Sequence, residues 1–497
     1  NVAVGNQTLH LLTTGTENTA LGFRACYGGT AGARNVGIGC SALKAVSTGN
    51  NNVAVGYHAM IALTTGNTNT AVGKNALMSI TTGTYCTALG TGALQVNTGA
   101  YNTAVGADSQ IANTTGQFNT SVGTNSMLAN TTGGNNTAVG YQALDANTGG
   151  EYNTALGSGA LSAITTGDRC TAVGTFSLSV NTGTYNCAFG MYALSANTSA
   201  QFNVAVGYQA ATANTTGEYN TAIGTYALDA NTTGGSCVAV GVGALGANTT
   251  ASYNVAVGNN ALLVNTTGTY NTAIGHKALE DNTASYNTAV GNGALQNNTT
   301  GEFNTALGDN ALITATTGEK NTALGRSAMT NTTTGSNNTA VGQNAGANIT
   351  TADSNTAVGS GAMQTATTGA DNTGVGYYAL HSENTGNYNT AVGRQSLANQ
   401  QGASASTAMG YRALYQNTTA SDNSAFGAYA LTTNTTGVRN TGLGRATLEA
   451  NTTGTDNTAV GHYALLSNTT AAENTAVGVY ALTTNTTGAS NVAVGRY

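Results

Sequence analysis

The chain has 497 residues, of which 6% are charged, and its 13 Lys and Arg against 19 Asp and Glu give a formal net charge of −6. With so few cations and no basic stripe, we expect no nucleic-acid partner. The longest apolar runs are a few residues, far short of the roughly 18 that cross a bilayer, so we expect no membrane insertion in this segment. The absence of proline and tryptophan, the 68 glycines and the 40% hydrophobic residues argue against collagen and against a disordered linker.

A five-residue phrase returns along the whole chain and in its commonest form reads Asn-Thr-Ala-Val-Gly, as at residues 69–73. Variants of the phrase begin at 30 places, from residue 1 to residue 491. Of the 29 intervals, 26 are 17 residues long and three, beginning at residues 86, 170 and 271, are 16. Such a period indicates stacked units. We therefore expect residues 1–497 to form one continuous repeat domain that belongs to a longer array.

We number each unit 1 to 17 from the Asn of the phrase, so that residues 304–320 are one complete unit. A unit is too short for a helical hairpin and shows no 3.6-residue apolar spacing, whereas two short strands and two turns fit. The sequence therefore predicts an all-β fold, a parallel β-solenoid or β-roll of about 29 coils, with each coil hydrogen-bonded to the next at about 4.8 Å. Equivalent positions then stack directly above one another.

The first nine positions of the unit hold large and small apolar residues at separate places. Position 5 is Gly in all 30 copies, which predicts a corner of positive φ at the end of a strand. Position 4 is Val, Leu, Ile, Phe or Met, and position 9 is usually Leu, so we assign both to the core. Positions 3 and 8 are almost always Ala. Because successive strand residues face opposite ways, these small residues predict a second packed face.

The turn at positions 12 to 15 reads Asn-Thr-Thr-Gly in many units, a composition typical of turns with positive φ. Asn recurs at positions 1 and 12, where amides in register can bond from coil to coil. Charged residues fall at positions 6, 7, 10, 11, 16 or 17, which we expect to face solvent, with Glu383 at position 12 the one exception. In twelve units the turn matches the N-glycosylation pattern and is predicted to lie at the surface, at Asn113, Asn130, Asn214, Asn231, Asn248, Asn265, Asn298, Asn417, Asn434, Asn451, Asn468 and Asn485.

Aromatic residues occupy position 17 in four successive units, at Tyr253, Tyr270, Tyr286 and Phe303. Stacking of these rings would stabilise their coils. The alternative is an aromatic strip that binds sugars.

Groups with catalytic or metal-binding chemistry are sparse, so we predict no catalytic, metal or cofactor site. The histidines lie at outward positions many coils apart and form no metal site with one another. Of the six cysteines, only Cys170 and Cys187 are one coil apart, and their positions 1 and 2 should face opposite ways, which argues against a disulfide. Cys86, Cys170 and Cys237 replace the Asn of position 1 and are interpreted as small buried residues.

The phrase Asn-Thr-Ala-Val-Gly-x-x-Ala-Leu resembles the repeat in the heads of trimeric autotransporter adhesins of the YadA type. It is equally similar to the Asn-Thr-Ala-Val-Gly repeats of tail-fibre-like bacterial surface proteins that end in a self-cleaving chaperone domain. The resemblance implies a left-handed parallel β-roll and three chains side by side, which would account for the small residues at positions 3 and 8. The 17-residue unit is longer than the adhesin unit of about 14, and neither a neck, a coiled-coil stalk nor an anchor is visible in the sequence.

We therefore predict an extracellular or cell-surface structural protein, a section of a rigid fibre or adhesin shaft without enzymatic activity. Its expected partners are other copies, in a lateral trimer or an end-to-end filament, and possible further partners are glycans or a host surface. Two alternatives stay open. One is an ice-binding solenoid with Thr ladders, against which positions 13 and 14 count because they are neighbours on opposite faces. The other is a glycan-binding module that uses the aromatics of position 17.

Overall fold

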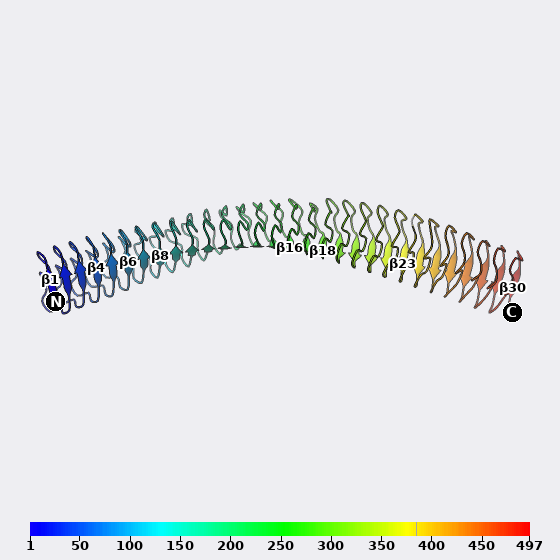
Figure 1. Ribbon diagram of the computed structural model, residues 1–497, viewed down its shortest axis with the longest axis horizontal. Coiled ribbons are helices and arrows are strands. Elements are labelled where there is room, and N and C mark those ends of the chain that lie inside the picture. Colours follow the sequence, from blue (N-terminus) through cyan, green and yellow to red (C-terminus); the bar gives the residue numbers. More distant parts are fainter. Residues whose placement is uncertain (384) are drawn as a thin grey trace. The chain divides into compact units, whose positions relative to one another are not determined.

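The computed structural model describes residues 1–383 and 385–497, and this part of the chain contains strands and turns but no helix. The chain divides into two compact units, residues 1–252 and 253–497. From here on a unit is one of these two, each 17-residue repeat is one coil, and the two units are described separately. Every repeat contributes one strand of three residues, at positions 2 to 4. Figure 1 shows the successive strands of each unit side by side, joined by loops. The predicted parallel β-solenoid is confirmed, while its handedness and the continuity of one domain stay predictions.

The strands of the first unit are β1 (Val2–Val4), β2 (Thr19–Leu21), β3 (Val36–Ile38), β4 (Val53–Val55), β5 (Thr70–Val72), β6 (Thr87–Leu89), β7 (Thr103–Val105), β8 (Thr120–Val122), β9 (Thr137–Val139), β10 (Thr154–Leu156), β11 (Thr171–Val173), β12 (Cys187–Phe189), β13 (Val204–Val206), β14 (Thr221–Ile223) and β15 (Val238–Val240). Each pairs in parallel with the next, and equivalent positions are partners.

The strands of the second unit are β16 (Val255–Val257), β17 (Thr272–Ile274), β18 (Thr288–Val290), β19 (Thr305–Leu307), β20 (Thr322–Leu324), β21 (Thr339–Val341), β22 (Thr356–Val358), β23 (Thr373–Val375), β24 (Thr390–Val392), β25 (Thr407–Met409), β26 (Ser424–Phe426), β27 (Thr441–Leu443), β28 (Thr458–Val460), β29 (Thr475–Val477) and β30 (Val492–Val494). Their pairing is also parallel and in register.

Glycine at position 5 is required both by its backbone conformation and by the next coil. Gly207 has a φ of 138°, and a Cβ placed on it would lie 2.6 Å from the carbonyl oxygen of Gly224. The predicted corner of positive φ is confirmed. Glycine at position 15 differs, because there a Cβ would meet the next coil although φ is ordinary; on Gly32 it would lie 2.5 Å from the carbonyl oxygen of Gly49. The positive φ predicted for this turn is therefore wrong at positions 12 and 15.

The core contains positions 1, 3, 8, 9, 12 and 15, and position 4 lies outside it. Ala222, Ala227 and Leu228 are fully buried, whereas Ile223 at position 4 is 40% exposed. The assignment of position 4 to the core was therefore wrong, as was the second packed face assigned to positions 3 and 8. Small and large residues share one interior, and the Val, Leu and Ile side chains of position 4 point outward.

The error arose from the backbone between positions 6 and 11, which forms turns where a second strand was predicted. Positions 7 and 9 have positive φ in most coils, as in Asn75 (φ 59°) and Leu77 (φ 48°). Two residues that flank position 8 in this left-handed conformation break the alternation of a strand. Positions 8 and 9 consequently both face inward, and Leu77 donates its amide hydrogen to the carbonyl of Ala93 in the next coil (3.0 Å).

The residue at position 3 must be small because its side chain points directly at the side chains of positions 8 and 9. A Cβ on Gly374 would lie 3.0 Å from Cγ of Met363, and one on Gly37 would lie 2.6 Å from Sγ of Cys26. Both partners occupy position 9 of the preceding coil, where Leu is the usual residue. The interior is therefore thin, and its small residues need no second chain to explain them.

Substitutions at adjacent residues of β17 test which side faces the core. We expect Ala273→Val to destabilise its coil by about 1–3 kcal/mol, because extra methyl groups in a packed core force side chains off their rotamers. Ile274→Thr, on the exposed side, should change stability by less than about 0.5 kcal/mol. Native-state hydrogen exchange of amides in residues 254–304 measures both. The reverse order of effects would contradict the assignment of the core.

Candidate functional surfaces

The outward side of each strand presents a large apolar residue at position 4 and, except for Cys187 in β12 and Ser424 in β26, Thr or Val at position 2. Leu307 is 48% exposed and Leu324 is 41% exposed, and equivalent residues line up along each unit in register. We call this surface, positions 2 and 4 of successive strands, the Thr-Val face. In one unit of 15 strands it exposes on the order of 1,000 Å², more than the apolar patches of roughly 300–600 Å² found on ordinary monomers. The face is therefore a candidate interaction surface.

The predicted amide ladders at positions 1 and 12 are confirmed and lie inside the coils. Asn136 donates its backbone amide to Oδ1 of Asn119 in the preceding coil (2.9 Å), and Nδ2 of Asn130 donates to Oδ1 of Asn113 (2.7 Å). Both ladders also meet at position 15: Nδ2 of Asn119 and Nδ2 of Asn130 donate to the carbonyl oxygen of Gly133, at 2.8 and 3.1 Å. Each coil is thus joined to the next by buried side-chain hydrogen bonds.

This burial contradicts the surface location that was predicted for the twelve Asn-Thr-Thr turns. Eleven of these asparagines are fully buried, namely all except Asn485, which is partly buried. The Nδ2 atom that would carry a glycan is already a hydrogen-bond donor within the stack, as in Asn231, where it donates to Asn214 and Gly234. Because a glycan on such an atom would separate the coils, the fold does not favour N-glycosylation at these residues.

Threonine at position 13 also bonds to the next coil. Oγ1 of Thr215 donates to the carbonyl oxygen of Thr232 (2.9 Å), and the backbone amides of Thr215 and Thr216 donate to the same oxygen. The hydroxyl ladder of position 13 therefore belongs to the stack. The ladder of position 2, on the Thr-Val face, and the threonines of position 14 face water.

The four aromatic residues predicted to stack do so within the second unit. Ring centroids are 4.9 Å apart for Tyr253 and Tyr270, 5.3 Å for Tyr270 and Tyr286, and 5.1 Å for Tyr286 and Phe303, with ring planes within 8° of parallel. Stacked ring faces are covered by their neighbours. This geometry supports the structural interpretation of the ladder over a sugar-binding strip.

Two further ladders of position 17 in the first unit were not predicted. Tyr85, Tyr101 and Phe118 stack at 5.3 and 4.9 Å. The second ladder includes a cation, because Arg169 lies over the rings of Tyr152 and Tyr185 at 5.4 and 5.6 Å, and Tyr185, Phe202 and Tyr219 continue it. The rule that identified the Tyr253 ladder, aromatic residues at equivalent positions of successive coils, identifies these two ladders as well.

Glu383 is the charged residue at position 12, and the structure buries it completely. Its Oε1 accepts hydrogen bonds from the backbone amides of Thr385 (2.9 Å), Gly386 (2.5 Å) and Gly402 (3.1 Å). Three amide donors compensate for the burial of this oxygen. Glu383 is thus held by the turn and is not exposed to a ligand.

Histidine and cysteine form no metal site in residues 1–383 and 385–497, where no group of three or more His, Cys, Asp or Glu is placed to hold an ion. The described histidines are His10, His58, His276, His381 and His462, and burial lowers the pKa of His381. Cys170 is buried and Cys187 is half-buried, and both are free thiols, as the opposite facing of positions 1 and 2 predicted. In the part of the chain that the structure describes, no helix is long and apolar enough to cross a membrane.

A scan of protein-family models and a search of curated protein sequences find no match to this chain. The resemblance to adhesin heads and tail-fibre-like repeats therefore stays a prediction.

Thiol reactivity tests the orientation of positions 1, 2, 6 and 9. Burial raises the pKa of Cys26 to about 12 and that of Cys170 to about 11. At pH 8 we expect alkylation of the half-buried Cys40 and Cys187 in the native protein, while the other four thiols react only after unfolding. Mass spectrometry of labelled peptides measures this. Native labelling of Cys170 as fast as that of Cys187 would contradict the buried position 1.

The same thiols predict how stability depends on pH. An unfolded thiol loses its proton near pH 8.5, whereas folded Cys26 and Cys170 keep theirs to about pH 12 and 11. The native state therefore binds more protons in this window, and stability falls as pH rises above about 8.5. We expect a double Cys26→Ala, Cys170→Ala variant to lose less stability between pH 8 and pH 10 in urea unfolding. An equal loss in both proteins would assign the alkaline sensitivity to other groups.

Proposed function

We propose that this chain is a non-catalytic structural protein, a section of an extracellular fibre or adhesin shaft, and that copies associate side by side through the Thr-Val face. The observation that carries the proposal is the exposed line of Val, Leu and Ile at position 4, including Leu307 and Leu324. Nothing else in the coil needs these residues to be apolar, since positions 3, 8 and 9 already fill the interior.

The chemistry of the coils suits a load-bearing role. Successive coils are joined by strand pairing and, in most coils, by the amide ladders of positions 1 and 12 and the Thr ladder of position 13. Each coil is thereby stabilised by the coils on either side of it, as in other repeat arrays. A protein of this kind functions through its stiffness and its surface, without a reacting group.

A second copy is the occupant that the Thr-Val face fits best. One unit exposes on the order of 1,000 Å² there, comparable to the ~800 Å² that each partner buries in a standard interface. The strands in this face are parallel and in register, and two such sheets pack face to face about 10 Å apart with side chains interdigitated. The resemblance to trimeric adhesins implies three chains, and lateral contact through this face would serve such a trimer equally.

Charges placed on the Thr-Val face should abolish lateral association. We expect Leu307→Lys with Leu324→Lys to leave the fold intact, because both side chains point outward, and to shift the full chain toward monomer through repulsion and desolvation across the contact. Sedimentation velocity over a concentration series measures the shift, and electron micrographs distinguish side-by-side bundles from end-to-end filaments.

Asn259→Lys with Gln343→Lys is the matched control, since it adds the same charge at exposed position 6, beyond the glycine corner that ends each strand. Equal dissociation of both variants, or a parent chain that stays monomeric at its highest soluble concentration, would refute lateral association through this face.

Ice binding is the second candidate, favoured by the outward Thr ladder of position 2. Thr305 and Thr322 are exposed and directly paired in register, so hydroxyls repeat at about 4.8 Å beside the apolar residues of position 4. Positions 2 and 4 lie on the same face, so the objection that positions 13 and 14 face opposite ways does not apply to this Thr-x-Val array. If it orders water, the protein should inhibit ice recrystallisation, and Thr322→Tyr should remove more inhibition than Thr300→Tyr at exposed position 14. A parent chain without inhibition would eliminate this candidate.

A further inference from the structure

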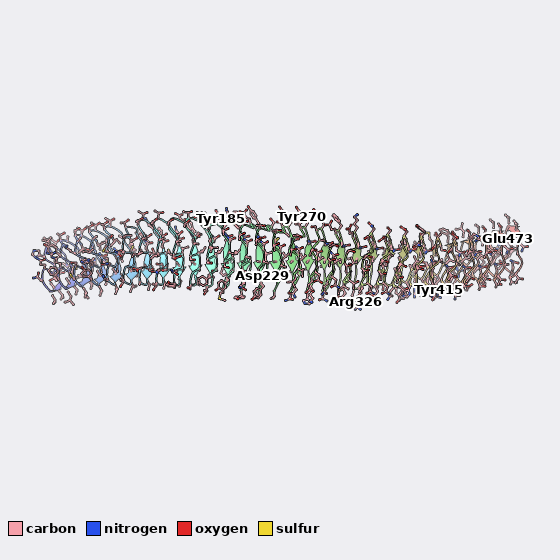
Figure 2. All side chains as sticks on the ribbon, turned by 90° about the horizontal axis from the view of Figure 1, so that it is seen from above. Tyr185, Asp229, Tyr270, Arg326, Tyr415 and Glu473 are labelled. Carbon is pink, nitrogen blue, oxygen red and sulfur yellow. The ribbon has the colours of Figure 1, made fainter. Side chains whose placement is uncertain are left out.

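One edge of the second unit gathers the Tyr and Arg side chains of residues 377–497, except Tyr388 and Arg439 at position 17. Positions 6, 7 and 10 of successive coils stack along this edge, and Figure 2 shows Arg326 (position 6) and Tyr415 (position 10) opposite Tyr270 and Glu473 (position 17). From residue 377 onward these positions hold eight tyrosines, four arginines and two histidines against one acidic residue, Glu449. The tyrosines and arginines, here called the Tyr/Arg edge, are Tyr377, Tyr378, Tyr411, Tyr415, Tyr429, Tyr463, Tyr480, Tyr497, Arg394, Arg412, Arg445 and Arg496.

The arginines of this edge contact aromatic rings. Arg394 lies 5.6 Å from the ring centroid of Tyr377 and 6.0 Å from that of Tyr411, and Arg412 lies 5.4 Å from Tyr411 and 5.0 Å from Tyr415. Nε of Arg412 donates to Oε1 of Gln395 (3.0 Å), which orients the guanidinium. Neither of the two ion pairs found among the described residues includes an arginine of the edge. Their charges are thus held in place by neutral groups and are available to an anion.

The opposite edge of the same coils carries the opposite charge. Between residues 321 and 497, positions 16 and 17 hold five acidic residues and one arginine, whereas positions 6, 7, 10 and 11 hold five arginines and one acidic residue. The two edges therefore have formal charges of −4 (one minus five) and +4 (five minus one) within a chain whose net charge is −6. The acidic residues are Asp353, Asp371, Asp422, Asp456 and Glu473.

We infer that the Tyr/Arg edge binds an acidic polysaccharide, laid along the stack of coils. Guanidinium groups bind carboxylate or sulfate through paired N–H donors, and tyrosine offers a flat apolar ring with a hydroxyl for the polar and apolar sides of a sugar. Coils repeat at about 4.8 Å, so the edge is a linear series of such groups. Tyr411 and Tyr429 meet edge to face, with ring planes 85° apart, whereas Tyr480 and Tyr497 at the far end of the edge are stacked within 7° of parallel, as the position-17 rings are.

Two other polyanions fit this edge less well. Duplex DNA carries one negative charge per about 1.7 Å of axis, far denser than four arginines spread over seven coils, whereas a polysaccharide charged once per sugar is sparser. On the acidic edge of a second copy Asp456 is already paired with Arg439 (2.7 Å). The charges left for the arginines are Asp353, Asp371, Asp422 and Glu473, which are sparser than one per coil. The inference is independent of lateral association, which uses the Thr-Val face.

Affinity electrophoresis of the full chain tests the inference with four probes: polygalacturonate, dextran sulfate, neutral dextran and duplex DNA. We expect polygalacturonate, dextran sulfate or both to retard the protein, neutral dextran to have no effect, and salt to weaken the retardation. Retardation by only one acidic polymer identifies carboxylate or sulfate as the preferred group. No retardation by either polymer, or retardation by DNA as strong as by the polysaccharides, would overturn the inference.

Variants locate the contact on the edge. Arg394→Gln with Arg412→Gln should weaken binding about tenfold or more, the loss expected for two charge-assisted contacts, and Tyr411→Ala should weaken it without a change in charge. Arg439→Gln, on the opposite edge, is the matched control and should bind as the parent does. Circular dichroism checks the fold of each. An equal loss of binding in the Arg439→Gln control would show that net charge alone causes the effect. A changed sedimentation coefficient of the Arg394→Gln, Arg412→Gln variant without polymer would indicate that the edge contacts a second copy. Either result refutes the inference.

Discussion

The close approach of successive coils at position 5 determines the register of each unit. A Cβ on Gly207 would lie 2.6 Å from the carbonyl oxygen of Gly224, so the chain turns at this corner only where glycine occurs. Once the corners coincide, every other position meets its equivalent in the next coil. The amide ladders depend on that alignment, because a shift of one residue would leave buried Asn side chains without partners, at a cost of about 1–3 kcal/mol for each group. Glycine and asparagine thus enforce the same register from two sides of the coil.

The features predicted correctly from the sequence are those that depend on residue type and period alone. Glycine at position 5, asparagine at positions 1 and 12, and the stacked rings of Tyr253, Tyr270, Tyr286 and Phe303 all follow from equivalent residues in register. The orientation of position 4 did not follow, because it depends on the positive φ of Leu at position 9, a conformation that this residue type rarely adopts. A strand was the natural expectation for an Ala-Leu pair, and strand alternation then placed position 4 in the core.

The Asn-Thr-Thr-Gly segment shows the same limit in another form. Its composition is that of a surface turn, yet Asn130 is fully buried and Thr131 donates its hydroxyl to the next coil. A segment can have the backbone of a turn and still contribute buried ladders when a neighbouring copy of itself covers it. Sequence patterns for turns and glycosylation are derived from chains without such a neighbour, and for this reason they misplace Asn113 and its equivalents.

The Tyr/Arg edge was not predicted from the sequence because its residues come from three different positions of the 17-residue repeat. Arg394, Arg412 and Tyr415 occupy positions 6, 7 and 10, which join one edge only because the left-handed residues at positions 7 and 9 turn the chain there. Inward positions are constrained by register and packing, whereas these outward positions can vary between coils without cost to the stack. A segregation of charge to opposite edges is therefore not required by the fold. The outward positions, rather than the repeat itself, are thus where differences between coils that bear on function are to be sought.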